Sequence, residues 1–190
     1  ESLTPNRNQI DFINKNFKHL TTHNCKFENF VPNKKYGTVI NSESLQYISL
    51  DEAFENVEQM TLPNGRWIIV DYFRLNDEGI NKSGHLIKSF REKLQESNWR
   101  IINEHDITLN VLPTLSFIYM YLDRLLFPIK HFAYEKFRYK SPKLYYMSGK
   151  LRKYIDNKIK KESASIDPEL FIKEKVYMFY VLEKNQPNQK

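Results

Sequence analysis

The apolar residues of this chain follow two spacings that alternate as far as residue 113. One is a repeat of three or four positions, which predicts amphipathic helices, and the other is a short apolar cluster bounded by polar residues, which predicts strands. The predicted helices span residues 4–20, 50–60 and 86–94. The predicted strands span residues 25–30, 36–41, 66–73 and 99–107. Strands and helices that alternate with short links indicate crossover connections, and therefore an α/β protein with a mostly parallel sheet.

Local signals predict where these elements begin. Thr4-Pro5 is a helix start, because a hydroxyl accepts hydrogen bonds from free amides and Pro fits the first helical position. Ser49 and Glu52 form a capping box before the second helix. The turn LPNG (62–65) leads into RWIIVDYF (66–73), a run of the kind that a sheet covered on both faces buries.

The alternation stops at Pro113. The segment LSFIYMYLDRLLF (115–127) predicts an apolar helix, but Asp123-Arg124 interrupts it and it is shorter than the ~20 residues that span a bilayer. The strand KVYMFYVLEK (175–184) ends the pattern. We therefore expect a helical insertion at about 108–167, before the last strand.

Composition indicates the class and setting of the protein. With 190 residues, of which 41% are hydrophobic and 27% charged, the chain is long enough for one globular domain with a core. A single cysteine, Cys25, provides no disulfide framework and favours a reducing, cytoplasmic setting. The chain begins without Met and without a signal-peptide pattern, so we expect a fragment or a trimmed chain.

The net charge of +6 is concentrated in one segment. Residues 130–161 contain eleven Lys or Arg and two acidic residues, so this segment carries +9 and the rest of the chain carries −3. Seven Phe and Tyr residues are interspersed with these cations. The pattern fits three alternatives: nucleic-acid binding by cations and stacking rings, a solvated face over a tyrosine core, or a cover for an amphiphilic ligand or membrane surface.

Five segments occur in the order in which a known enzyme family has similar ones. They are SLTPNRNQIDFI (2–13), VINSESLQYISLDEAF (39–54), LPNGRWIIVDYF (62–73), FREKLQESNWRIINEHDIT (90–108) and VYMFYVLEK (176–184). The chain resembles the later part of a class I S-adenosylmethionine-dependent methyltransferase. The family's usual turn is Leu-x-Pro-Gly-Gly, whereas this turn is one residue shorter and has Asn64. The resemblance implies a doubly wound, Rossmann-like sheet, a single partial domain over 1–190 and S-adenosylmethionine as cofactor.

The resemblance also implies that one central strand is missing from residues 1–190. In the family, the first strand and its Gly-rich loop surround the methionine end of the cofactor, and both would precede residue 1. The five glycines of the chain form no G-x-G pattern; they are Gly37, Gly65, Gly79, Gly84 and Gly149. The resemblance therefore implies that residues 1–190 alone lack part of the cofactor site.

The resemblance predicts the cofactor-binding residues. Glu1 falls where the family has a carboxylate that accepts hydrogen bonds from the ribose hydroxyls. The residue near the adenine amino group is either Lys26, which departs from the family's usual acidic residue, or Glu28-Asn29. Glu43 and Ser44 follow a strand that would lie beside the missing one, so we expect them near the methionine end.

Three further residues are candidates for the acceptor side. Tyr47 and Tyr72 are predicted to bind the acceptor, and His105 is the candidate general base because its ordinary pKa lies near neutrality. His19, His23 and Cys25 are too few for a zinc site without a second cluster. We interpret the two histidines as imidazoles near a helix C-terminus and predict no metal.

The sequence therefore favours methyl transfer from S-adenosylmethionine to a small, amphiphilic or lipid-like acceptor. The alternative is a non-catalytic module that uses segment 130–161 to bind RNA, an anionic membrane or a protein partner. A membrane surface is the stronger candidate partner and nucleic acid the weaker. The acceptor atom, whether O, N or C, and the oligomeric state are not predicted.

Overall fold

The computed structural model describes residues 1–79 and 82–185. The chain falls into two compact units. Of the described residues, the first unit contains 1–71, 88–105 and 179–185, and the second contains 72–79, 82–87 and 106–178.

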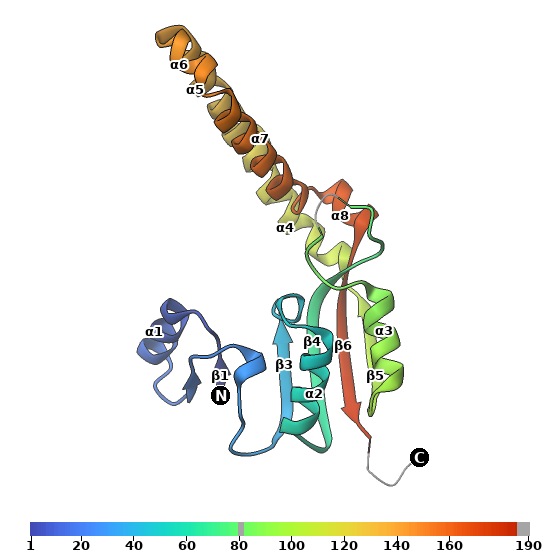
Figure 1. Cartoon of the computed structure of the whole chain (residues 1–190). Helices are drawn as coiled ribbons and strands as arrows, with labels where there is room; N and C mark the ends of the chain where they lie inside the picture. Colours follow the sequence, from blue (N-terminus) through green and yellow to red (C-terminus); the bar gives the residue numbers. More distant parts are fainter. Residues whose placement is uncertain (80–81, 186–190) are drawn as a thin grey trace. The chain divides into compact units, whose positions relative to one another are not determined.

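The main sheet has four strands in the order β3, β4, β6, β5. Their bounds are Tyr36–Ser42 for β3, Thr61–Arg74 for β4, Trp99–Asp106 for β5 and Lys175–Lys184 for β6. β3 and β4 are parallel, with Val39 opposite Trp67, whereas β6 runs in the opposite direction (Figure 1). This arrangement confirms the predicted α/β fold with a Rossmann-like sheet and helices before the last strand.

Two helices cover the sheet in the first unit: α2 (Leu50–Met60) and α3 (Ile87–Glu96). As predicted, Ser49 caps α2, and its side chain accepts a hydrogen bond from the Glu52 amide. Aromatic rings form much of the core: Phe54 of α2 meets Trp67 of β4 edge to face at 5.0 Å between ring centroids. Such pairs stabilise a core beyond the area that they bury.

The turn LPNG lies within β4, which begins five residues earlier than the predicted strand. Residues 62–65 are accommodated by a register shift, since Tyr36 pairs with Thr61 but Thr38 pairs with Arg66. Asn64 takes the left-handed conformation, with φ 59°. A Cβ at Gly65 would lie 2.8 Å from the Leu62 carbonyl oxygen, so the turn requires glycine there.

A second, two-stranded parallel sheet pairs β1 (Ser2–Leu3) with β2 (Thr22–His23), and α1 (Arg7–Asn16) lies between them in the sequence. The predicted helix start at Thr4-Pro5 was wrong. Asn6 is the cap instead, because its side chain accepts a hydrogen bond from the Asn8 amide at 3.0 Å.

The predicted strand at 25–30 was also wrong. The chain pairs with β1 earlier, at β2, and residues Phe27–Asn29 form a single 3-10 turn, η1. In this turn the Asn29 amide bonds to the nearby Lys26 carbonyl at 3.1 Å, so the segment satisfies its backbone locally instead of by strand pairing.

Helices fill the sequence between β5 and β6. They are α4 (Thr108–Tyr121), the π-helical η3 (Leu122–Leu126), α5 (Phe127–Lys140), α6 (Pro142–Met147), α7 (Gly149–Ala164) and α8 (Pro168–Glu174). The predicted start of the first of these at Leu115 was seven residues late, because Asp106 accepts a hydrogen bond from the Thr108 amide and fixes an earlier start. Among the described residues, no helix is both long enough and apolar enough to cross a membrane.

Candidate functional site

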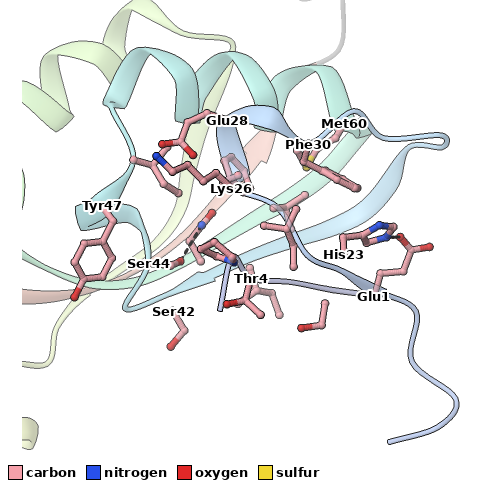
Figure 2. Close-up of a pocket in the computed structure, with 18 of the residues that line it drawn as sticks. Glu1, Thr4, His23, Lys26, Glu28, Phe30, Ser42, Ser44, Tyr47 and Met60 are labelled. Carbon is pink, nitrogen blue, oxygen red and sulfur yellow. Dashed lines mark hydrogen bonds and ion pairs between the residues drawn. The ribbon is translucent and has the colours of Figure 1, made fainter. Parts of the chain in front are cut away.

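A cavity of about 910 Å³ lies in the first unit and is lined along two strands (Figure 2). Ser2 and Leu3 of β1 and residues 38–42 of β3 are among its lining residues. In the described sheets, β1 pairs with β2 alone and β3 is an edge strand. The volume is within the range of small-molecule sites, about 300–1,000 Å³, and the ends of parallel strands are where α/β sheets bind ligands.

The turn after β3 is held by a buried amide. Asn41 is 4% exposed; its Oδ1 accepts a hydrogen bond from the Trp67 indole at 2.9 Å, and its Nδ2 donates to Ser44 Oγ at 3.0 Å. Glu43 takes the left-handed conformation, with φ 50°, and its amide donates to the Val70 carbonyl at 2.9 Å. Non-glycine residues in this conformation are uncommon and cluster at ligand sites.

Three side chains surround the carboxylate of Glu1. The Lys34 Nζ lies 2.6 Å from Oε1, and the Tyr36 hydroxyl and His23 Nε2 lie 2.5 and 3.0 Å from Oε2. The bond from Lys34, followed by those from Tyr36 and His23, lowers the pKa of Glu1 to about 2. Burial, followed by the Glu1 carboxylate, raises the pKa of Tyr36 to about 12. At neutral pH, Glu1 is therefore ionised and Tyr36 is a protonated donor.

Figure 2 shows Glu1 and His23 together at one end of the cavity and Tyr47 at the other. Between them the lining combines Lys26 and Glu28 with hydroxyl groups and with apolar side chains, of which Ile40 is 63% exposed. Carboxylates accept hydrogen bonds from hydroxyl and amino groups, and apolar side chains pack against flat rings. The lining can therefore bind a ligand that combines a sugar with an aromatic base.

The structure brings together five of the eight predicted site residues. Those that line the cavity are Glu1, Glu28, Glu43, Ser44 and Tyr47. Asn29 is the last residue of η1, next to Glu28, but it does not line the cavity.

Tyr72 and His105 have other surroundings. In the second unit, the Tyr72 hydroxyl donates to Ser83 Oγ at 2.9 Å, and the Lys175 Nζ lies 4.2 Å from the centroid of the Tyr72 ring. In the first unit, His105 is near the end of β5, where its ring stacks on Phe179 with 6.4 Å between centroids. Neither residue lines the cavity.

The sequence alone did not indicate the partners of Glu1 or the role of Asn41. A usable signal for Asn41 was its place directly after Val39 and Ile40 in a predicted strand, because buried amides need partners. The interpretation of His19 and His23 as residues near a helix C-terminus was wrong, since α1 ends at Asn16 and His23 belongs to β2. The described residues contain no group of three or more His, Cys, Asp or Glu that could hold a metal ion.

Comparison with known sequences gives no match, either to a protein-family profile or to a curated protein. Solved structures are similar, however. An O-methyltransferase from a trans-AT PKS multienzyme of Brevibacillus brevis, in complex with S-adenosyl-L-homocysteine, has a TM-score of 0.63 at 15% identity over 96% of this chain and 57% of that one. The cyclopropane synthase MmaA2 from Mycobacterium tuberculosis has a TM-score of 0.64 at 13% identity over 96% and 68%.

A third similar structure is geranyl diphosphate C-methyltransferase from Streptomyces coelicolor A3(2), in complex with Mg2+, geranyl-S-thiolodiphosphate and S-adenosyl-L-homocysteine. Its TM-score is 0.63 at 14% identity over 96% of this chain and 60% of that one. The chain thus spans between 57% and 68% of the length of these three proteins. Sequence identities this low are evidence of a shared fold only. The chain has the Rossmann-like fold of S-adenosylmethionine-dependent methyltransferases.

Proposed function

We propose that the chain is a large part of an enzyme that transfers a methyl group from S-adenosylmethionine to a small, amphiphilic or lipid-like acceptor. The observation that supports this most is the cavity beside β3, where Glu1, Glu28, Glu43 and Ser44 meet within a methyltransferase fold. One protein of similar fold is a geranyl diphosphate C-methyltransferase, whose named substrate is itself amphiphilic.

The lining fits the nucleoside part of this cofactor. Glu28 offers a carboxylate to the adenine amino group, and Ile40 and neighbouring apolar residues offer packing for the ring. A carboxylate has about four acceptor positions, and three donors already bond to Glu1. Glu1 can therefore accept one ribose hydroxyl as it stands, and a second hydroxyl displaces a donor such as Tyr36.

The turn after β3 supplies groups for the methionine end. The Glu43 carboxylate suits an ammonium group, and the Ser44 hydroxyl suits a carboxylate. Asn41 fixes the position of Ser44 through its amide. Because this turn is anchored in the core by Asn41, we expect its side chains to be preorganised for binding.

When bound, S-adenosylmethionine supplies an electrophilic methyl group for direct in-line transfer to a nucleophilic O, N or C. The chain contributes most by positioning, since holding two reactants in line removes much of the entropic barrier. We assign acceptor binding to Tyr47, which lines the cavity. His105 removes a proton only if the acceptor must lose one.

We further propose that residues 1–190 are part of a larger methyltransferase domain, and that cofactor binding requires one more strand. β1 and β3 line the same cavity, and each has an edge without a strand partner in the described sheets. Unpaired edges of this kind accept an additional strand. The chain covers only 57–68% of the length of the three similar structures, which supports the same proposal.

Glu43→Ala tests the assignment of the methionine end in a form of the protein extended upstream of residue 1. Loss of a charge-assisted hydrogen bond, worth about 1.5–3 kcal/mol, should weaken binding of S-adenosylhomocysteine by roughly tenfold to a hundredfold in calorimetry. Glu55→Ala, an exposed position on α2, is the matched control and should bind normally. Unchanged affinity of Glu43→Ala would remove Glu43 from the site.

A further inference from the structure

Helices α4 to α7 form a hairpin within the second unit, with α6 at its far end (Figure 1). We call residues 108–164 the arm. Lys130 of α5 pairs with Asp156 of α7 at 2.9 Å, which joins the two sides. Across the whole arm only Thr108 and Ala164 are buried, so these helices enclose no apolar core of their own.

The far end of the arm exposes a group of large apolar side chains. We define the tip as residues 136–155. Six of its apolar or aromatic residues are more than half exposed: Tyr139, Leu144, Tyr146, Met147, Leu151 and Tyr154. Tyr139 and Met147 are the most exposed, at 89% and 82%. Exposed apolar residues gathered in this way mark an interaction surface.

The tip is also strongly cationic. Its twenty residues include seven Lys or Arg and no Asp or Glu. The nearest acidic residues in the sequence flank it: Glu135 lies 3.8 Å from Arg138, and Asp156 pairs with Lys130. The lysines at 140, 143, 150 and 153 are all exposed.

The fold of the tip depends on a different set of residues. The Arg152 guanidinium lies 3.4 Å from the centroid of the Tyr145 ring and donates to the Tyr145 carbonyl at 2.8 Å. Phe137 packs edge to face on Tyr145, with 5.8 Å between centroids. The exposed lysines, Leu144 and Met147 are therefore available to a partner without disturbing these contacts, whereas Tyr146 also meets the Tyr145 ring edge to face, with 5.8 Å between centroids.

We propose that the tip of the arm docks on an anionic lipid membrane, with the exposed apolar side chains in the interface and the lysines on lipid phosphates. Tyrosine at the headgroup level, aliphatic residues below it and lysines around them are the pattern of interfacial binding. A second copy of the arm is a poorer occupant, because seven like charges from each copy would repel. RNA would use the rings but leave Leu144, Met147 and Leu151 exposed.

This inference does not depend on methyl transfer, so it is tested by binding alone. The full chain is sedimented with vesicles of phosphatidylcholine, and with vesicles that contain about a quarter phosphatidylserine. We expect binding to the anionic vesicles at about 0.1 M salt, little binding to the neutral ones, and release at about 0.5 M salt because charges are screened.

Two variants separate charge from apolar insertion. The triple change Lys140→Gln, Lys143→Gln, Lys150→Gln should weaken vesicle binding by about a hundredfold, since each lysine near the surface contributes roughly a factor of five. The double change Leu144→Ser, Met147→Ser, at two exposed positions, keeps the charge and should weaken binding several-fold.

The matched control removes the same charge from the first unit, by Lys15→Gln, Lys18→Gln and Lys88→Gln, all exposed positions. It should bind almost as the original chain does. Equal losses in both triple variants, or no binding to anionic vesicles, would overturn the proposal. The proposal would also be overturned if the chain does not bind vesicles but self-associates or binds RNA, and the tip substitutions abolish that binding.

Discussion

Lys175 is a buried cation at the start of β6, and its replacement by Met should stabilise the protein at neutral pH. Lys175 is 4% exposed, and its Nζ donates to Ser83 Oγ at 3.1 Å and lies over the Tyr72 ring. Burial lowers the pKa of Lys175 to about 8; Glu174 opposes this shift and Arg74 adds to it.

The size of the expected stabilisation follows from the shift in the pKa of Lys175. A fall from 10.5 to about 8 means that the folded state disfavours the charged form by about 3 kcal/mol. The contact with the Tyr72 ring offsets up to about 2 kcal/mol of this. Met keeps the apolar stem and has no charge to desolvate. We therefore expect Lys175→Met to raise the free energy of unfolding by about 1–3 kcal/mol at pH 7.

The effect of Lys175 on the free energy of unfolding depends on pH. Between the folded pKa of about 8 and the unfolded value of 10.5, the unfolded chain binds more protons at Lys175 than the folded chain does. The stability of the original protein therefore rises with pH across this window. The advantage of Lys175→Met should be complete below pH 8 and should shrink as the pH approaches 10.5.

Urea unfolding at pH 7 and pH 10 measures this directly. Lys173→Met, at an exposed position of α8, is the control and should change the free energy of unfolding by less than about 0.5 kcal/mol. If Lys175→Met is less stable than the original protein at pH 7, or if its advantage is the same at both pH values, the reasoning about the buried charge is refuted.

Two further substitutions test the site. Asn41→Leu should lower the free energy of unfolding by about 1–3 kcal/mol, because it leaves the buried Trp67 indole without its acceptor; urea unfolding that matches the original protein would contradict this. Lys34→Met removes the largest cause of the low pKa of Glu1. The midpoint of the Glu1 carboxyl in a carbon NMR titration should therefore rise from about 2 toward 4.5. The stability that Glu1 contributes is present above pH 4.5 and is lost as the pH falls toward 2. If the Glu1 midpoint does not move in Lys34→Met, the bonds from Tyr36 and His23 are enough to keep the pKa of Glu1 low.

The long elements could be predicted because their signals are local and agree with one another. The capping box at Ser49 and Glu52 starts α2 where expected, and β6 spans 175–184 as the apolar run indicates. The strand at 66–73 was found for the same reason, although β4 begins earlier because its turn is part of the pairing with β3.

The short elements could not be predicted, because pairing between distant residues decides them. β1 and β2 have two residues each, and their register depends on a partner about twenty positions away. No local pattern favours Thr22–His23 as a strand over the segment CKFENF (25–30) that follows. The helix start shifted for a similar reason: Thr4 and Asn6 are both good caps, but the Thr4 amide bonds to the His23 carbonyl at 3.1 Å, and Asn6 caps α1.

The candidate site was predictable where it follows a strand. Glu43, Ser44 and Tyr47 come directly after β3, and all three line the cavity. The partners of Glu1 were not predictable, since Lys34 and Tyr36 reach it from more than thirty residues away.

The central claim is that the cavity beside β3 binds S-adenosylmethionine once the sheet is complete. Calorimetric titration of S-adenosylhomocysteine into this chain, and into a form extended upstream of residue 1, tests it most directly. We predict binding by the extended form and weak or no binding by residues 1–190 alone. A folded extended form that does not bind would contradict the claim and leave the similarity to methyltransferases as one of fold only.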